Sequence, residues 1–248
     1  MIILKSLKEI ERMRESCKIV AEVLEILKTE IKPGTTTKSL DLIAEKEAVK
    51  RKAKPAFKGY SGYPYSLCCS VNEQVVHGMP NKNVLVEGDI LSIDFGVVYN
   101  GFYGDAAITV PVGKINSNAE KLIKVTEESL YAGIEKARPG NKLSDISHAV
   151  QSYVEQRGFS VVREFVGHGI GRSLHESPQI PNFGTPGRGV NLKVGMVLAI
   201  EPMINEKGPD VKILEDGWTA VTCDNGLSAH FEHTVAIMEN GAEILTVV

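Results

Sequence analysis

The sequence is poor in the features that mark secreted and membrane proteins. Its 248 residues contain four cysteines, two of them adjacent at Cys68 and Cys69, and none has the C-x-x-C spacing of a zinc site. No apolar stretch approaches the roughly 20 residues that a membrane span needs. The N-terminus, MIILKSLKEI, also lacks the extended apolar region of a secretory signal. We therefore expect reduced thiols, a cytoplasmic location and no contact with a membrane.

An excess of positive charge is also missing. The net charge is −3 and the isoelectric point is about 6.1, so the chain has no general attraction to nucleic acid. One basic run, KRKAK at 50–54, is interpreted as a solvated helix end rather than a docking patch. With 43% hydrophobic and 24% charged residues, the composition is typical of a globular protein with a substantial core.

The motifs of three enzyme classes are absent or incomplete. An H-E-x-x-H zinc motif fails because His175-Glu176-Ser177-Pro178 ends without a second histidine. No G-x-S-x-G marks a nucleophile elbow, and GHGIG at 167–171 lacks the complete dinucleotide-binding pattern. These absences argue against those three kinds of site.

What the sequence does contain is an internal repeat. LVEGDILSID at 85–94 returns as LKVGMVLAIE at 192–201, KPG at 32–34 returns as RPG at 138–140, and VNEQVVHG at 71–78 returns as VREFVGHG at 162–169. Three matches in the same order indicate a duplication within a single domain, residues 1–248. Its two halves, about 1–112 and 113–248, should face each other across a pseudo-twofold axis.

Each half is expected to place helices before strands. Capping boxes begin amphipathic helices at Ser6 and Ser117, which stop before the Pro-Gly pairs at 33–34 and 139–140. Further helices are expected at 37–52 and 143–157, and strands at 65–76, 89–95, 103–111, 160–166, 196–203 and 228–238. This order predicts an α+β fold in which helices back a curved, mainly antiparallel sheet.

Carboxylates stand inside or at the end of four predicted strands. Side chains alternate along a strand, so Asp94 lies on the face opposite its aliphatic neighbours, and the repeat puts Glu201 in the equivalent place. Asp105 and Glu232 interrupt two further apolar strands, where no lysine or arginine neutralises them. Buried unpaired carboxylates are costly, so a pair of divalent metal ions is the favoured partner.

Three histidines complete the candidate site. His168 and His175 lie in the glycine-rich segment 167–178, and His77 ends the repeat copy of the strand before His168. Any one of them alone is more often a core or turn residue. Two histidines at corresponding places, beside acids at corresponding strand ends, favour a metal or catalytic site.

Several long motifs resemble the type I methionine aminopeptidases in their short bacterial form. They are VNEQVVHGMP, SIDFG, GFYGDAA, VGHGIGRSLHESPQIPNFG, MVLAIEPM and HFEHTVAI, in that order and over essentially the whole chain. The resemblance implies the pita-bread fold, in which two pseudo-symmetric halves surround a dinuclear metal centre. It also implies hydrolytic removal of an N-terminal methionine when the second residue is small.

The resemblance assigns a role to each candidate residue. The metal ligands would be Asp94, Asp105, His168, Glu201 and Glu232, with Asp105 and Glu232 bridging two ions of Co, Mn, Fe or Zn. Catalytic groups would be His77, His175 and Glu201, the last as general base. The methionine pocket would be lined by Phe57, Tyr60, Tyr63, Cys68, His77, His175 and Trp218, with Leu174 nearby. Further implications are a monomer that acts on nascent-protein N-termini, near the ribosome.

Two alternatives stay open at this stage. A proline-directed aminopeptidase or dipeptidase would share the fold and the metals, although such relatives usually have an additional N-terminal domain. A binding protein that kept the fold and lost its chemistry would be expected to lack at least one ligand, and all five are present.

Overall fold

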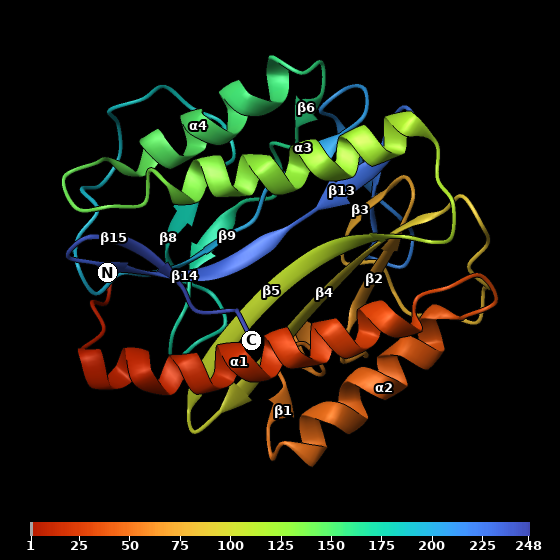
Figure 1. The fold of residues 1–248 in the computed structure, drawn as a ribbon, viewed down its shortest axis with the longest axis horizontal. Helices are drawn as coiled ribbons and strands as arrows, with labels where there is room; N and C mark the ends of the chain where they lie inside the picture. Colours follow the sequence, from red (N-terminus) through yellow and green to blue (C-terminus); the bar gives the residue numbers. More distant parts are fainter. Residues whose placement is uncertain (1) are drawn as a thin grey trace.

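The computed structural model describes residues 2–248, and its helices occur as two pairs (Figure 1). The pairs are α1 (Leu7–Glu30) with α2 (Thr37–Lys50), and α3 (Ser117–Ile134) with α4 (Leu143–Glu155). One pair lies on each side of the junction between strands β5 (Phe102–Pro111) and β14 (Glu232–Met238). A short 3-10 helix, η1 (Tyr60–Gly62), lies in the connection after α2.

A nine-stranded antiparallel sheet joins the two halves. Its order is β1-β4-β5-β14-β9-β7-β8, with β15 added to β14 and β2 added to β4. The other bounds in this sheet are β1 (Lys54–Pro55), β2 (Cys68–Val71), β4 (Ile90–Tyr99), β7 (Gly167–Gly169), β8 (Glu176–Ile180), β9 (Val197–Ile200) and β15 (Gly241–Ile244). The predicted α+β class with a mainly antiparallel sheet is confirmed.

Two small three-stranded sheets flank the large one. One has the order β13-β10-β6 and the other β11-β12-β3. Their strands are β3 (Gln74–Val76), β6 (Ser160–Val161), β10 (Met203–Asn205), β11 (Val211–Ile213), β12 (Ala220–Thr222) and β13 (Ser228–His230).

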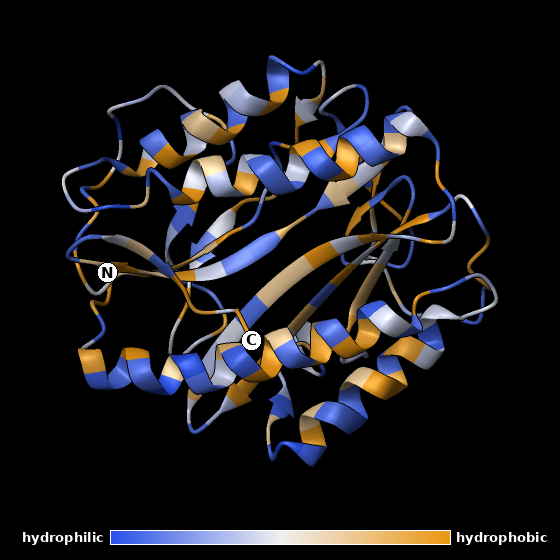
Figure 2. Ribbon diagram, viewed as in Figure 1, coloured by the Kyte–Doolittle hydropathy of each residue, from blue (hydrophilic) through white to orange (hydrophobic). Residues whose placement is uncertain are grey.

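The helices cover the aliphatic face of the sheet. Leu91 and Ile93 of β4 are fully buried in one cluster with apolar residues of α1 and α2. Ser92 and Asp94 point to the other face, as strand alternation predicts, and Ser92 is hydrogen-bonded to Thr109 of β5. Figure 2 shows the mixed apolar and polar surface of each helix, which suits a layer with one buried side.

Equivalent contacts recur in the two halves. The Leu85 N–H donates to the Thr35 carbonyl (2.8 Å), and the Leu192 N–H donates to the Asn141 carbonyl (2.9 Å). The isolated bridges Thr36–Val84 and Lys142–Asn191 repeat the same relation. The two repeat segments that read LVEGDILSID and LKVGMVLAIE therefore enter the fold in the same way.

The third repeat match is wrong as a structural equivalence. In the second half, His168 of β7 pairs with Ala199 of β9. Ser92 of β4 is the repeat counterpart of Ala199, and its partner is Ser70 rather than His77. His77 follows β3, which turns away from the large sheet and pairs with β12. The two histidines reach the same region from different local structures.

Several predicted elements also differ in detail. Strand 65–76 is divided at Asn72, whose φ of 54° makes a tight turn between β2 and β3. Only two residues of the predicted strand 160–166 form β6, and β4 continues five residues past Asp94, to Tyr99. The helix predicted to be capped by Ser117 is capped by Asn116, whose side chain accepts hydrogen bonds from Asn118 and Ala119.

Two long predicted strands change sheets partway along. The segment 196–203 leaves the large sheet after Ile200 and resumes as β10, and the segment 228–238 changes between β13 and β14. Pro202, which has no N–H to donate, lies at the first change. Glu201 lies between β9 and β10, and Glu232 is the first residue of β14, so both acids lie where the chain passes from one sheet to the other.

Candidate metal centre

One small cavity is lined by every residue proposed for the site from the sequence. It is about 140 Å³ in volume, below the roughly 300–1,000 Å³ of pockets for drug-sized ligands, and so suits one amino-acid side chain. Its lining residues are Phe57, Tyr60, Tyr63, Cys68, His77, Asp94, Asp105, His168, Leu174, His175, Glu201, Trp218 and Glu232. The fold thus brings together groups that lie up to 175 residues apart in the chain.

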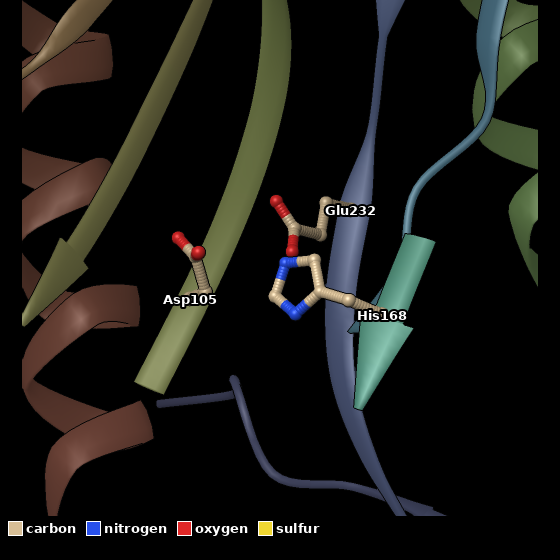
Figure 3. Close-up of side chains that lie close together, drawn as sticks. All are labelled: Asp105, His168 and Glu232. Atoms are coloured by element: carbon tan, nitrogen blue, oxygen red, sulfur yellow. The ribbon is translucent and has the colours of Figure 1, made fainter. Parts of the chain in front are cut away.

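Three of these side chains converge from three different strands. Figure 3 shows Asp105 on β5, His168 on β7 and Glu232 on β14 pointing toward one another. One ligand atom from each lies within 4.8 Å of the other two, and the same holds for Glu201, His230 and Glu232. Both groups of donors are close enough to share a metal ion.

Two threonines hold the junction that carries the acids. Only two residue pairs join β5 and β14 directly. On one side the Asp105 N–H donates to Thr234 Oγ1, which donates to the Asp105 carbonyl (3.2 and 2.7 Å). On the other side the His230 N–H donates to Thr109 Oγ1, which donates to the His230 carbonyl (2.9 and 2.8 Å). The hydroxyls replace missing ladder bonds and fix the backbone under the acids.

The cluster is short of hydrogen-bond partners. Among residues 2–248, five buried side-chain atoms have none, and four of them belong here: Asp94 Oδ1, Asp105 Oδ1, His230 Nε2 and Glu232 Oε1. Buried polar atoms in proteins are normally paired, so this concentration calls for a partner. Divalent cations accept carboxylate and imidazole ligands of this kind, and the residues therefore fit a metal.

Burial and mutual repulsion resist the charging of all four acids. Burial raises the pKa of Asp94 to about 7 and that of Glu201 to about 8. Burial, with the neighbouring carboxylates, also raises the pKa of Asp105 and of Glu232 well above the usual values. A divalent cation would remove this penalty, because it supplies the positive charge that no lysine or arginine in the cavity lining provides.

His168 is prepared to act as a neutral ligand. Its Nδ1 is 2.9 Å from the carbonyl of Gly169, which fixes the proton on Nδ1 and leaves Nε2 with a free lone pair. Nε2 lies 3.5 Å from Glu201 Oε1. Burial lowers the pKa of His168 to about 3, so the ring stays neutral near pH 7.

His77 and His175 face the same cavity with different supports. His77 has a φ of 60°, in the left-handed region that residues other than glycine seldom adopt, and burial lowers its pKa to about 4. The following Gly78 cannot carry a Cβ, which would lie 2.2 Å from the Cys69 carbonyl oxygen. His175 Nδ1 is 2.7 Å from the hydroxyl of Tyr60.

The remaining part of the cavity is mainly apolar. Phe57, Tyr63 and Cys68 are buried, and the rings of Tyr63 and Trp218 meet edge to face with centroids 5.1 Å apart. The Tyr63 hydroxyl donates to main-chain carbonyls behind the pocket, such as that of Gly78 at 3.0 Å. The apolar walls therefore belong to a rigid layer.

His230 is the residue that sequence reasoning missed. It lies two positions before Glu232 in HFEHTV, and strand alternation would have placed both side chains on one face. The same face carries the unpartnered Nε2 atom of His230, 3.6 Å from Glu201 Oε2. The spacing of His230 and Glu232 in the sequence could have identified His230, but only Glu232 was assigned to the site.

A curved sheet that holds four carboxylates and an imidazole at one small cavity is the kind of site that metal-dependent enzymes use. A profile of metallopeptidase family M24 matches residues 11–239, and the chain belongs to that family. This match agrees with the resemblance noted from the motifs, and the relatives described next confirm it.

Curated and solved relatives agree with this assignment. The chain is 59% identical to the methionine aminopeptidase of Clostridium perfringens, with all of both chains covered. It is 57% identical to methionine aminopeptidase 1 of Bacillus subtilis, with 99% of each covered. Among solved structures, a methionine aminopeptidase of Thermotoga maritima has a TM-score of 0.99 at 52% identity, again with full coverage. The predicted pita-bread fold is confirmed by this likeness.

None of the helices within residues 2–248 has the length and apolar character to traverse a bilayer.

Proposed function

We propose that this chain is a metal-dependent aminopeptidase that removes the N-terminal methionine from peptides and nascent proteins. The observation that carries the proposal is the single cavity in which unpartnered carboxylates meet a small apolar pocket. The acids and histidines supply hydrolytic chemistry, and the pocket has room for one unbranched side chain. The relatives named methionine aminopeptidase, matched over their full lengths, support the same activity.

Two divalent ions are proposed, held by Asp94, Asp105, His168, Glu201 and Glu232. Four carboxylates and one imidazole suit borderline-hard ions, so Co, Mn, Fe and Zn are all compatible with the donor set. When bound, such ions lower the pKa of water and polarise a peptide carbonyl.

His175 is proposed to stabilise the oxyanion that forms from the first peptide carbonyl. When the Tyr60 hydroxyl donates to Nδ1, the imidazole proton lies on Nε2 and can be donated into the cavity. The ring of His175 stands 4.3 Å from that of His168, so this donor lies beside the candidate ligands.

Proton transfer is proposed for the two remaining polar groups. Glu201 faces the cavity and would accept the proton of the attacking water as general base. His77, neutral near pH 7, would assist proton transfer at the departing nitrogen. Its ring contacts Phe165 and Trp218 edge to face, which limits its rotation.

The apolar walls are proposed to select methionine. Phe57, Tyr63, Cys68 and Trp218 would contact the side chain, and the confined space beyond the scissile bond would favour Gly, Ala or Ser as second residue.

We also propose cytoplasmic action near the ribosome by a monomer. Within the basic run 50–54, Arg51 is already paired with Glu22 at 2.8 Å.

Release of free methionine from Met-Ala-Ser tests the function directly. Chelator-stripped protein is titrated with Mn²⁺ or Co²⁺, with Met-Leu-Ser and Ala-Pro-Ala assayed alongside. Metal-dependent cleavage of Met-Ala-Ser alone is the expected result. Cleavage of only Ala-Pro-Ala would replace the proposal with a proline-directed peptidase, and metal binding without any cleavage would favour a binding protein.

A further inference from the structure

Glu201 stands between two imidazoles, only one of which was predicted to belong to the site. Its Oε1 atom lies 3.5 Å from His168 Nε2, and its Oε2 atom lies 3.6 Å from His230 Nε2. His230 is 1% exposed, and its Nε2 atom has no hydrogen-bond partner. A buried, unpartnered nitrogen aimed at a carboxylate is rare in a native structure and points to a role.

The backbone of His230 is held in place from both sides. Its N–H and carbonyl are both bonded to Thr109 Oγ1 on β5, at 2.9 and 2.8 Å. It also pairs with Met203 of β10. The imidazole is therefore presented to Glu201 by a fixed strand end.

His230 lies behind Glu201 as seen from the cavity. Glu201 and His168 line the cavity, whereas His230 does not. Carboxylates that ligate metals are usually held by hydrogen bonds from residues behind them, and loss of such a bond weakens metal binding. At 3.6 Å the two atoms are beyond hydrogen-bond range, and an approach of about 0.6 Å by the carboxylate would close the bond.

We propose that His230 is a positioning residue that donates its Nε2–H to Glu201 and holds this carboxylate for metal binding. The inference rests on the proposed function, because it presumes that Glu201 is a ligand. Direct ligation by His230 is the competing arrangement, since donor atoms of Glu201, His230 and Glu232 lie within 4.8 Å of one another.

Two substitutions separate the donor from the bulk of the ring. His230→Gln keeps an N–H donor at similar reach, and His230→Leu fills similar space without one. Calorimetric titration of chelator-stripped protein with Co²⁺ should show affinity reduced by about 10–100-fold in His230→Leu and restored to within about threefold in His230→Gln. Equal affinity of His230→Leu and the unmodified protein would overturn the proposal.

His233→Leu is the matched control on the same segment. The Nδ1 atom of His233 is bonded to Thr246 at 2.8 Å, and its side chain does not line the cavity. Its substitution removes a partly buried imidazole without touching Glu201, so Co²⁺ affinity should stay unchanged. A loss equal to that of His230→Leu would show that any nearby imidazole deletion disturbs the centre, and would overturn the specific role.

A measurement on the unmodified protein decides between positioning and ligation. In the proton NMR spectrum of Co²⁺-loaded protein, each coordinated imidazole gives a strongly shifted, exchangeable N–H signal. One such signal, from His168, is expected, and two would make His230 a ligand and overturn the proposal. If the unmodified protein binds Co²⁺ and cleaves Met-Ala-Ser, and His230→Leu behaves in the same way, only the role of His230 is refuted. Protein that binds no Co²⁺ refutes the proposed function as well.

Discussion

Replacing Lys5 with methionine should destabilise the protein through a buried ion pair beside the site. The Lys5 ammonium contacts the Glu176 carboxylate, and the two side chains are only 4% and 8% exposed. Glu176 directly follows His175, and its Oε1 atom accepts hydrogen bonds from the N–H groups of Arg172 and Ser173 (2.8 and 3.3 Å). The pair therefore ties the N-terminal segment to the loop that presents His175.

The expected cost follows from leaving one charge without its partner. Lys5→Met retains the apolar stem and the main-chain bond from Lys5 to Gly195, but strands the Glu176 carboxylate. Breaking a buried pair from one side costs about 3–5 kcal/mol. The two retained N–H bonds to Glu176 place the expected value at the lower end, about 3–4 kcal/mol. For a chain of this size, that lowers Tm by about 6–16 °C.

Differential scanning calorimetry of four variants tests this reasoning. Lys5→Met/Glu176→Gln removes both charges while the amide oxygen still accepts the two N–H bonds, so it should recover at least about 1.5 kcal/mol relative to Lys5→Met. Lys28→Met is the matched control, because its partner Glu25 is 3.8 Å away and both side chains are more than half exposed. That control should lose less than about 1 kcal/mol. A Tm of Lys5→Met equal to that of Lys28→Met would refute the argument, as would strict additivity of Lys5→Met and Glu176→Gln.

Three further predictions concern the centre itself. Asp105→Asn removes a proposed bridging carboxylate and should abolish paired metal loading, measured as metal content after dialysis; two ions retained with normal turnover would disprove the ligand assignment. Tyr60→Phe deletes the partner of His175 Nδ1 and should lower kcat more than it raises KM for Met-Ala-Ser; a change in KM alone would contradict a role in catalysis. Burial raises the pKa of Asp94 to about 7 and of Glu201 to about 8, so the folded metal-free protein keeps protons that the unfolded chain releases near pH 4. Asp105 and Glu232, whose pKa values are raised as well, add to the effect. The stability should therefore fall by at least about 1 kcal/mol between pH 7.5 and 9, where nearly all histidines of the unfolded chain are neutral, and Mn²⁺ should abolish the fall. A Tm that stays level over this range in the presence of chelator would contradict the pKa shifts.

Much of the fold followed from local sequence features. The amphipathic periodicity and the Pro-Gly stops located α1 and α3, and the further helices expected at 37–52 and 143–157 are present as α2 and α4. The alternation in residues 90–94 correctly separated an aliphatic face from a polar one. The doubled segments at 85–94 and 192–201 predicted that the two halves would enter the fold alike, as the twin bonds of Leu85 and Leu192 show. Such features are determined by neighbours along the chain, and a sequence displays them directly.

What the sequence alone could not decide was where strands leave one sheet for another. The chain passes from one sheet to another at Glu201 and again between His230 and Glu232. These passages depend on the pairing of β10 with β13 and of β14 with β5, and the paired strands are far apart in the chain. Those changes put His230 behind Glu201 and made its nitrogen part of the same cluster. The pairing of Lys5 with Glu176 is equally non-local. The sequence by itself determined which residue types were available for a metal site and on which strand face each stood. Only the tertiary structure decided which of them meet, because contacts between distant segments are set by sheet pairing and packing rather than by local pattern.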